Sequence, residues 1–147
     1  GMRPAVNVGL SVSRVGGAAQ TKAMKKAAGS IRIDLAQYRE MEVFTQFSSD
    51  LDDDTKEQLQ YGKGLMELLK QPLCQPLSMA EQVITLWTAT HKIFLNVDVK
   101  KIKETQKGML EYIRNAHPEI IDELNETKAL SDELGDKILA AAKEYVK

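Results

Sequence analysis

Apolar residues recur at helical spacing along most of the chain. Ile31, Leu35 and Tyr38 follow one another at the i, i+4, i+7 spacing that places side chains on one face of a helix. A second apolar face of the same 31–47 stretch comprises Ile33, Ala36, Phe44 and Phe47. A helix that is apolar on two sides is typical of a position between neighbours, so we expect this one to pack on both faces.

The middle of the chain predicts two helices separated by a loop. The acidic run Asp50–Asp54 favours a helix start, because the N-terminal end of the helix dipole attracts negative charge. The helix extends to about Lys70 and is weakened by Gly62 and Gly64. Two prolines then make 71–77 a loop.

The next helix carries the clearest start signal. Ser78 and Glu81 have the spacing of a capping box, in which each side chain accepts a hydrogen bond from the other residue's backbone N–H. An amphipathic stripe follows it: Met79, Val83, Leu86, Trp87, Thr90 and Phe94. We therefore expect residues 79–94 to bury this face in the core.

The last third of the chain predicts three further helical segments. Asp98 is placed to cap the first, Pro118 interrupts the chain before the second, and Ser131 begins the third. The residues expected to point inward are Val99, Ile102, Met109, Leu110, Ile113, Ile120, Ile121, Leu124, Leu134, Ile138, Ala141, Ala142 and Tyr145.

The chain changes character near Ser30. Residues 1–29 are poor in large apolar side chains, with a possible short strand at Val6–Val12 and a small-residue helical stretch at Gly17–Ala28. Alone, such a segment buries little apolar area. We expect 1–29 to be the edge of a neighbouring domain, and 30–147 to be an all-α bundle of about five to seven helices.

Composition narrows the classes of function. The chain has 147 residues, of which 43% are hydrophobic and 28% charged, with a net charge of −1. This balance provides no basic face for nucleic acid, and no apolar run approaches the roughly 20 residues that cross a bilayer. We expect neither nucleic-acid binding nor membrane insertion. Gly1-Met2 looks like a protease scar, so we also expect a piece of a longer protein.

Few side chains suggest chemistry by themselves. The run Asp50–Asp54 lacks the glycine and distal glutamate of a calcium loop, so a helix start is favoured over a cation site. Lys100, Lys101 and Lys103 are expected on an exposed helix face. Arg14 stands apart, because it lies between the possible strand and a glycine-rich helix start, where an arginine can be held out at a domain edge. On the residues alone, a structural role for this arginine stays the main interpretation.

The remaining reactive side chains favour plain interpretations. A single cysteine, Cys74, excludes an internal disulfide and a cysteine metal cluster, and indicates a cytoplasmic setting. We expect its thiol to be incidental. His91 and His117 are far apart in the sequence, without the spacing of a paired zinc-ligand motif, and are expected on the surface or at helix ends. No metal site is predicted.

The segment around Arg14 resembles a known family. Residues 3–20, RPAVNVGLSVSRVGGAAQ, are similar to the signature of F-type ATP synthase alpha subunits. The similarity continues in DLAQYRE at 34–40, FSSDLD at 47–52 and LLKQ at 68–71. It covers the chain from Arg3 onward and is loosest after about Ile93. A match of this length is highly specific.

The resemblance implies a place in a large assembly. In this family, alpha and beta subunits alternate around a rotating gamma stalk, and each has a barrel, a nucleotide-binding domain and a C-terminal helical bundle. The chain would then be the C-terminal part of a regulatory, non-catalytic alpha subunit in a peripheral complex at the cytoplasmic face of a bacterial membrane. Residues 1–29 would be the C-terminal edge of its central nucleotide-binding domain, and 30–147 its helical bundle. Its partners would be beta, gamma and the rest of alpha. ATP or ADP with Mg²⁺ would bind the full-length subunit, and none is expected on this segment alone.

The resemblance also implies roles for particular residues. Arg14 matches the arginine of the VSRVG motif, which reaches into the catalytic site of the adjacent beta subunit as an arginine finger. A planar, permanently charged guanidinium suits the pairing with phosphate oxygens. Arg3, Pro4 and Gln71 match positions at the edge of the non-catalytic nucleotide site. The family loop commonly reads Gln-x-Gln-Tyr-Ser-Pro, whereas positions 73 and 74 here hold leucine and cysteine, which removes a polar partner from the adenine side.

Two alternatives stay open. Phe47–Asp54 resembles the loop that faces the central stalk, so its acidic residues would contact the rotor, but a plain helix cap explains them as well. For the whole chain, the alternative is a stand-alone helical adaptor that binds protein partners. Residues 3–29 favour the synthase subunit, because an isolated bundle has no need of a polar, glycine-rich strand end with an exposed Arg14.

Overall fold

The computed structural model describes residues 3–5, 13–45 and 51–146, and the regular elements in these ranges are all helices. In order they are α1 (Arg14–Ala19), α2 (Lys22–Ala28), α3 (Ile31–Thr45), α4 (Asp53–Leu69), α5 (Met79–Thr90), the 3-10 helix η1 (Val99–Lys101), α6 (Ile102–Ala116), α7 (Pro118–Thr127) and α8 (Asp132–Val146). The all-α bundle is confirmed, with α3 to α8 following Ser30. The strand predicted at Val6–Val12 lies outside the described residues.

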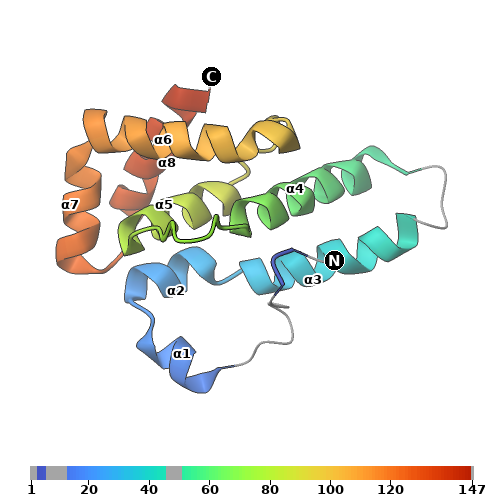
Figure 1. The fold of residues 1–147 in the computed structure, drawn as a ribbon, viewed down its shortest axis with the longest axis horizontal. Coiled ribbons are helices and arrows are strands. Elements are labelled where there is room, and N and C mark those ends of the chain that lie inside the picture. Colours follow the sequence, from blue (N-terminus) through green and yellow to red (C-terminus); the bar gives the residue numbers. More distant parts are fainter. Residues whose placement is uncertain (1–2, 6–12, 46–50, 147) are drawn as a thin grey trace.

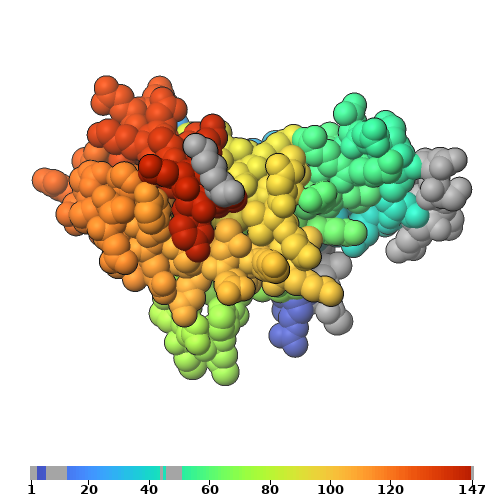
Figure 2. Space-filling view, turned by 90° about the horizontal axis from the view of Figure 1, so that it is seen from above, coloured from blue at the N-terminus to red at the C-terminus, as the bar shows by residue number. Residues whose placement is uncertain are grey.

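The helices pack around α5. Figure 1 shows α3 and α4 side by side and antiparallel, with α2 continuing the line of α3 beneath α5. α5 contacts α2, α4, α6, α7 and α8. Seen from above, α6 to α8 cover one half of the molecule, and α3 with α4 form the other end (Figure 2). One core cluster joins buried residues from α2 to α8.

The predicted inward faces of the later helices form this core. Val83, Met109, Ile113 and Ile138 have no exposed surface. Ile84 is also fully buried, although the predicted stripe did not include it. Full burial of side chains of this size contributes about 1.5–3 kcal/mol each relative to exposure. The prediction for Tyr145 is wrong: it is 40% exposed, and the hydroxyl end of its ring lies against Gly108 on α6.

The predicted helix starts are confirmed. Ser78 and Glu81 form the capping box at α5, where the backbone N–H of Ser78 donates to Glu81 Oε2 at 2.8 Å. Asp98 caps η1 by accepting from the N–H of residue 100 at 2.8 Å. Ser131 accepts from the N–H of Leu134 at 3.1 Å. Each contact satisfies a donor that the first helical turn leaves without an intrahelical partner.

The segment before Ser30 differs from the expected single helical stretch. Thr21 caps α2, with its hydroxyl accepting from the N–H of Met24 at 3.2 Å, so α1 and α2 are separate helices. Ala23 and Ala27 of α2 are buried against the core, where their small side chains allow α2 to approach α5 closely. Packing of the bundle thus begins in α2, ahead of Ser30. The assignment of 1–29 to a neighbouring domain stays a prediction.

α3 buries one of its two apolar faces. Ile31, Leu35 and Tyr38 are buried, as predicted. On the second face, Ile33 is 61% exposed and Ala36 is exposed. Within the described chain, α3 packs on α4 through one side, so the expectation that the second face is covered is wrong at Ile33 and Ala36. The side chains of Phe44 and Phe47, which complete that predicted face, lie outside what the structure describes.

Candidate functional site

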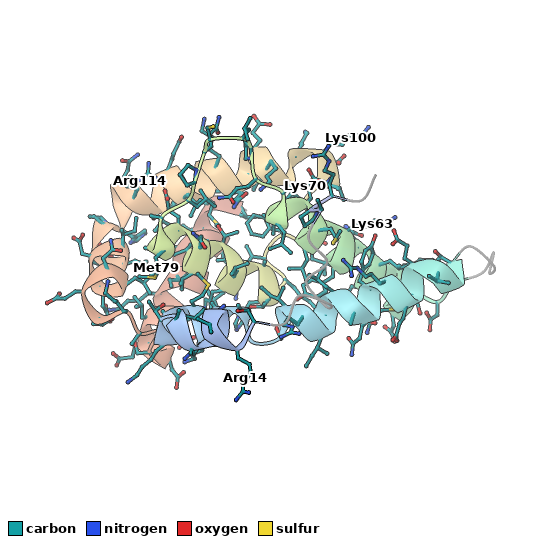
Figure 3. The ribbon with its side chains drawn as sticks, turned by 60° about the horizontal axis from the view of Figure 1, so that its bottom comes forward. Arg14, Lys63, Lys70, Met79, Lys100 and Arg114 are labelled. Carbon is teal, nitrogen blue, oxygen red and sulfur yellow. The ribbon has the colours of Figure 1, made fainter. Side chains whose placement is uncertain are left out.

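Arg14 is the first residue of α1. Ser13 caps this helix, its hydroxyl accepting from the N–H of Gly16 at 2.8 Å, so Ser13 holds a helix start here rather than a strand end. No residue of α1 is buried. Figure 3 shows the Arg14 side chain extending away from the helices into open space. The guanidinium is therefore free to reach a group outside this chain.

The other three predicted site residues do not gather in one place with Arg14. Arg3 is exposed and Pro4 is partly exposed, in a short described segment that precedes α1 in the sequence. Gln71 is exposed just after α4, in the loop that leads to α5. Among the described residues, no hydrogen bond joins Arg3 to Gln71. The predicted nucleotide-site residues thus lie in separate exposed segments of this chain, and a neighbouring domain would have to complete a site between them.

Gln71 lines a groove that the sequence did not indicate. It has a volume of ≈ 600 Å³ and runs between the 71–77 loop and α6, lined by Gln71, Pro72, Gln75, Pro76, Leu77, Glu81, Lys103, Glu104, Gln106, Lys107, Leu110, Glu111 and Arg114. Lys70 and Arg114, both labelled in Figure 3, lie on two sides of this region. The charged side chains in the lining comprise three cations and three carboxylates, so the groove has no net preference for an anion.

Lys103 differs from the exposed lysine expected at its position. Lys100 and Lys101 are exposed as predicted, whereas Lys103 is half-buried. Its Nζ donates to Leu68 O at 2.8 Å and to Gln106 Oε1 at 3.1 Å. Burial lowers the pKa of Lys103 below its usual value. The lysine thus satisfies a carbonyl at the end of α4 and ties that end to α6, a role that its spacing in the sequence does not reveal.

The described part of the acidic run has a structural role. Asp52 caps α4 by accepting from the N–H of Thr55 at 3.0 Å, and this hydrogen bond lowers the pKa of the Asp52 carboxyl. Asp53 pairs with Lys56 at 2.9 Å. The helix-start interpretation is confirmed for these residues. Residues 47–50, on which the stalk-contact hypothesis also rests, lie outside the described residues.

Both histidines lie at helix ends, as predicted. His91 is the C-cap of α5, where its Nδ1 lies 2.8 Å from Trp87 O and its ring 4.2 Å from that of Trp87. His117 joins α6 to α7 and packs against Tyr112. The Cys74 thiol is exposed in the 71–77 loop, beside a Leu73 side chain that is 90% exposed.

Comparison with known proteins identifies the family. Residues 20–145 match the model of the family described as ATP synthase alpha/beta chain, C terminal domain. The chain belongs to this family. Over all 147 of its residues it is 49% identical to ATP synthase subunit alpha of Clostridium kluyveri and 49% identical to ATP synthase subunit alpha of Lawsonia intracellularis.

The match to these relatives is partial on their side. The match includes 100% of this chain but only 29% of the length of each relative. It therefore corresponds to the C-terminal region of an ATP synthase alpha subunit. Across the described residues, no helix is both long enough and apolar enough to span a bilayer.

Proposed function

We propose that the chain acts as the C-terminal part of a regulatory, non-catalytic alpha subunit in an F-type ATP synthase, supporting ATP synthesis coupled to ion transport. The family match covers alpha and beta chains alike, and the two relatives of 49% identity are both alpha subunits. Beta subunits, the gamma stalk and the rest of alpha would be its partners, in a peripheral complex at the cytoplasmic face of a bacterial membrane.

Arg14 is proposed as an arginine finger for the catalytic site of the adjacent beta subunit. The observation that carries this proposal is its exposure on an unburied α1, clear of the bundle (Figure 3). Phosphoryl transfer spreads negative charge over the terminal phosphate oxygens, and an arginine supplied by a neighbouring subunit stabilises that charge. The fork of a guanidinium pairs with two such oxygens at once, which a lysine ammonium cannot do.

Replacing Arg14 in the assembled complex tests this role. We expect Arg14→Ala to lower the steady-state rate of ATP hydrolysis by a factor of about 10³–10⁵, the range that arginine fingers contribute in related hydrolases. Arg14→Lys should be nearly as slow, because it keeps the charge but loses the fork. Nucleotide affinity should change much less, since the contact matters most in the transition state.

Arg32→Ala is the matched control, because Arg32 is also an exposed arginine, on the neighbouring α3. It should leave turnover near normal. Assembly should survive in every variant, as one exposed side chain contributes little to a large interface. Near-normal hydrolysis by Arg14→Ala would reduce Arg14 to a structural residue. It would also revive the alternative of a helical adaptor, for which the described structure shows no specific feature.

The edge of the non-catalytic nucleotide site is the second part of the proposal. Arg3, Pro4 and Gln71 would border ATP or ADP with Mg²⁺ in the full-length subunit. Leu73 points into solvent at 90% exposure, where a glutamine would offer the adenine an amide. We expect Leu73→Gln to tighten Mg-ATP binding to the complete subunit, and calorimetry on the present chain alone to give no micromolar binding. Micromolar binding by this chain would contradict the proposal.

A further inference from the structure

A hollow of ≈ 560 Å³ is bordered by α1, α2 and the start of α3, with one residue each from α4 and α5. Figure 1 shows α1 below α2 on this side of the molecule. The lining comprises Ser13, Gly16, Gly17, Gln20, Met24, Lys25, Ala28, Gly29, Ile31, Arg32, Leu69 and Leu86. It includes neither Arg14 nor the predicted nucleotide-site residues. The volume falls in the range of small-molecule pockets, roughly 300–1,000 Å³.

Apolar side chains form one part of this lining. Ile31 is buried, and Met24, Ala28, Leu69 and Leu86 are partly buried where they pack against the core. The four partly buried side chains keep some surface that the described chain itself does not cover. Because withdrawing apolar surface from water stabilises a complex, this part of the lining favours a ligand with an apolar body.

The charged side chains of the lining are both cations. Lys25 and Arg32 are exposed, and neither forms an ion pair with another described residue. Lys26, the next residue along α2, is instead paired with Asp132. The lining holds no carboxylate, whereas in the groove beside Gln71 three carboxylates balance three cations. The hollow therefore favours an anion, to which a guanidinium and an ammonium donate charge-assisted hydrogen bonds.

We propose that this hollow binds an aliphatic carboxylate, a small organic anion with an unbranched apolar chain. Lys25 and Arg32 hold the carboxylate, and the planar guanidinium of Arg32 pairs with both of its oxygens. The apolar chain lies over Met24, Leu69 and Leu86 and withdraws their remaining surface from water. An inorganic anion would use only the two cations, and an uncharged chain only the apolar side chains, so each binds more weakly than the carboxylate.

NMR of this chain with isotope-labelled methionine methyl groups tests the site, with octanoate as the probe. Met24 lines the hollow, whereas Met109 is fully buried in the core and lies outside the lining. Octanoate should shift the Met24 methyl signal in a saturable manner and leave the Met109 signal in place. Octanol has the chain without the charge, and acetate has the charge with almost no chain. Each should bind at least about tenfold more weakly than octanoate.

Variants that remove one charge separate the two parts of the lining. Arg32→Gln and Lys25→Gln should each weaken octanoate binding by at least about threefold, and the double variant by about tenfold, while octanol binding stays unchanged. Lys22→Gln is the matched control, because Lys22 is an exposed lysine on the same helix as Lys25 but does not line the hollow. It should leave the affinity for both probes unchanged. Circular dichroism confirms that each variant keeps its helices.

The absence of a saturable Met24 shift with octanoate would overturn the site. Equal binding of octanoate and octanol would overturn it too, as would unchanged octanoate binding by the double variant, because the cations would then play no part. A shift at Met109 as large as the one at Met24 would indicate unspecific partition into the core and would also contradict the site. The hollow takes no part in the hydrolysis proposed for the complex, so none of these results bears on Arg14.

Discussion

Gly62 is the residue whose substitution the structure constrains most. A Cβ built on Gly62 of α4 would overlap the ring of Tyr38 and lie 2.6 Å from the Tyr38 Cβ. We expect Gly62→Ala to lower the free energy of unfolding by about 1–3 kcal/mol, because overpacking outweighs the roughly 1 kcal/mol that alanine adds to a helix. Urea denaturation followed by circular dichroism measures the change.

Gly17→Ala is the matched control, since a Cβ there meets nothing within 4 Å. It should leave stability unchanged or raise it slightly. A Gly62→Ala variant as stable as the original chain would show that Tyr38 moves aside easily. In the sequence, Gly62 indicates only a weak point in a helix. Gly62 makes room for Tyr38 because these particular turns of α4 and α3 meet in the folded chain. The pairing of turns depends on tertiary packing, so it cannot be read from the local spacing of residues.

At the scale of the element, the start of α5 is tied to α6. Glu81 accepts from the backbone of Ser78 and forms an ion pair with Arg114. Burial by itself would raise the pKa of the Glu81 carboxyl, but the hydrogen bonds from Ser78 and the Arg114 charge outweigh it and lower the pKa. The folded state therefore favours the charged form of Glu81.

A lowered carboxyl pKa contributes stability above the unfolded value of about 4.3, and the contribution is lost as the pH falls through the folded pKa. Glu81→Gln should lower the free energy of unfolding by about 0.5–2 kcal/mol at pH about 7. The gap from the original chain should narrow at pH about 3. Glu111→Gln, at an exposed position on α6, should show neither effect. A gap that is constant with pH would exclude the ionic contribution of Glu81.

Helix starts were predictable because a cap is a local contact. Ser78 with Glu81, Asp98 and Ser131 each act on a backbone N–H two or three residues away, so their spacing carries the information. Lys103 was not predictable, because its acceptor, Leu68 O, is 35 positions away on another helix. Among the candidate site residues, the exposure of Arg14 agrees with its motif, while the groove beside Gln71 depends on how α6 passes the 71–77 loop.

At the scale of the whole molecule, α2 closes the bundle from below. Figure 1 shows it beneath α5, and the backbone N–H of Ala23 donates to Lys128 O at 3.0 Å. Lys26 Nζ donates to Leu130 O at 3.0 Å and pairs with Asp132 at 2.6 Å. Composition placed this segment outside the bundle because its side chains are small. Small side chains instead permit the close packing of α2, which composition alone does not show.

Two shortened chains test the contribution of α2. A chain that begins at Thr21 keeps the cap and all of α2, and should unfold at nearly the same denaturant concentration as the original. A chain that begins at Ser30 removes α2 and exposes the side of α5 that Ala23 and Ala27 cover. Its free energy of unfolding should fall by about 3 kcal/mol, the order expected for burial of one or two apolar side chains. Hydrogen exchange should quicken along α5 and at the α7–α8 connection, where α2 makes its backbone contact. Equal stability of the two shortened chains would show that the bundle begins at Ser30 after all, and that α2 rests on its surface without supporting it.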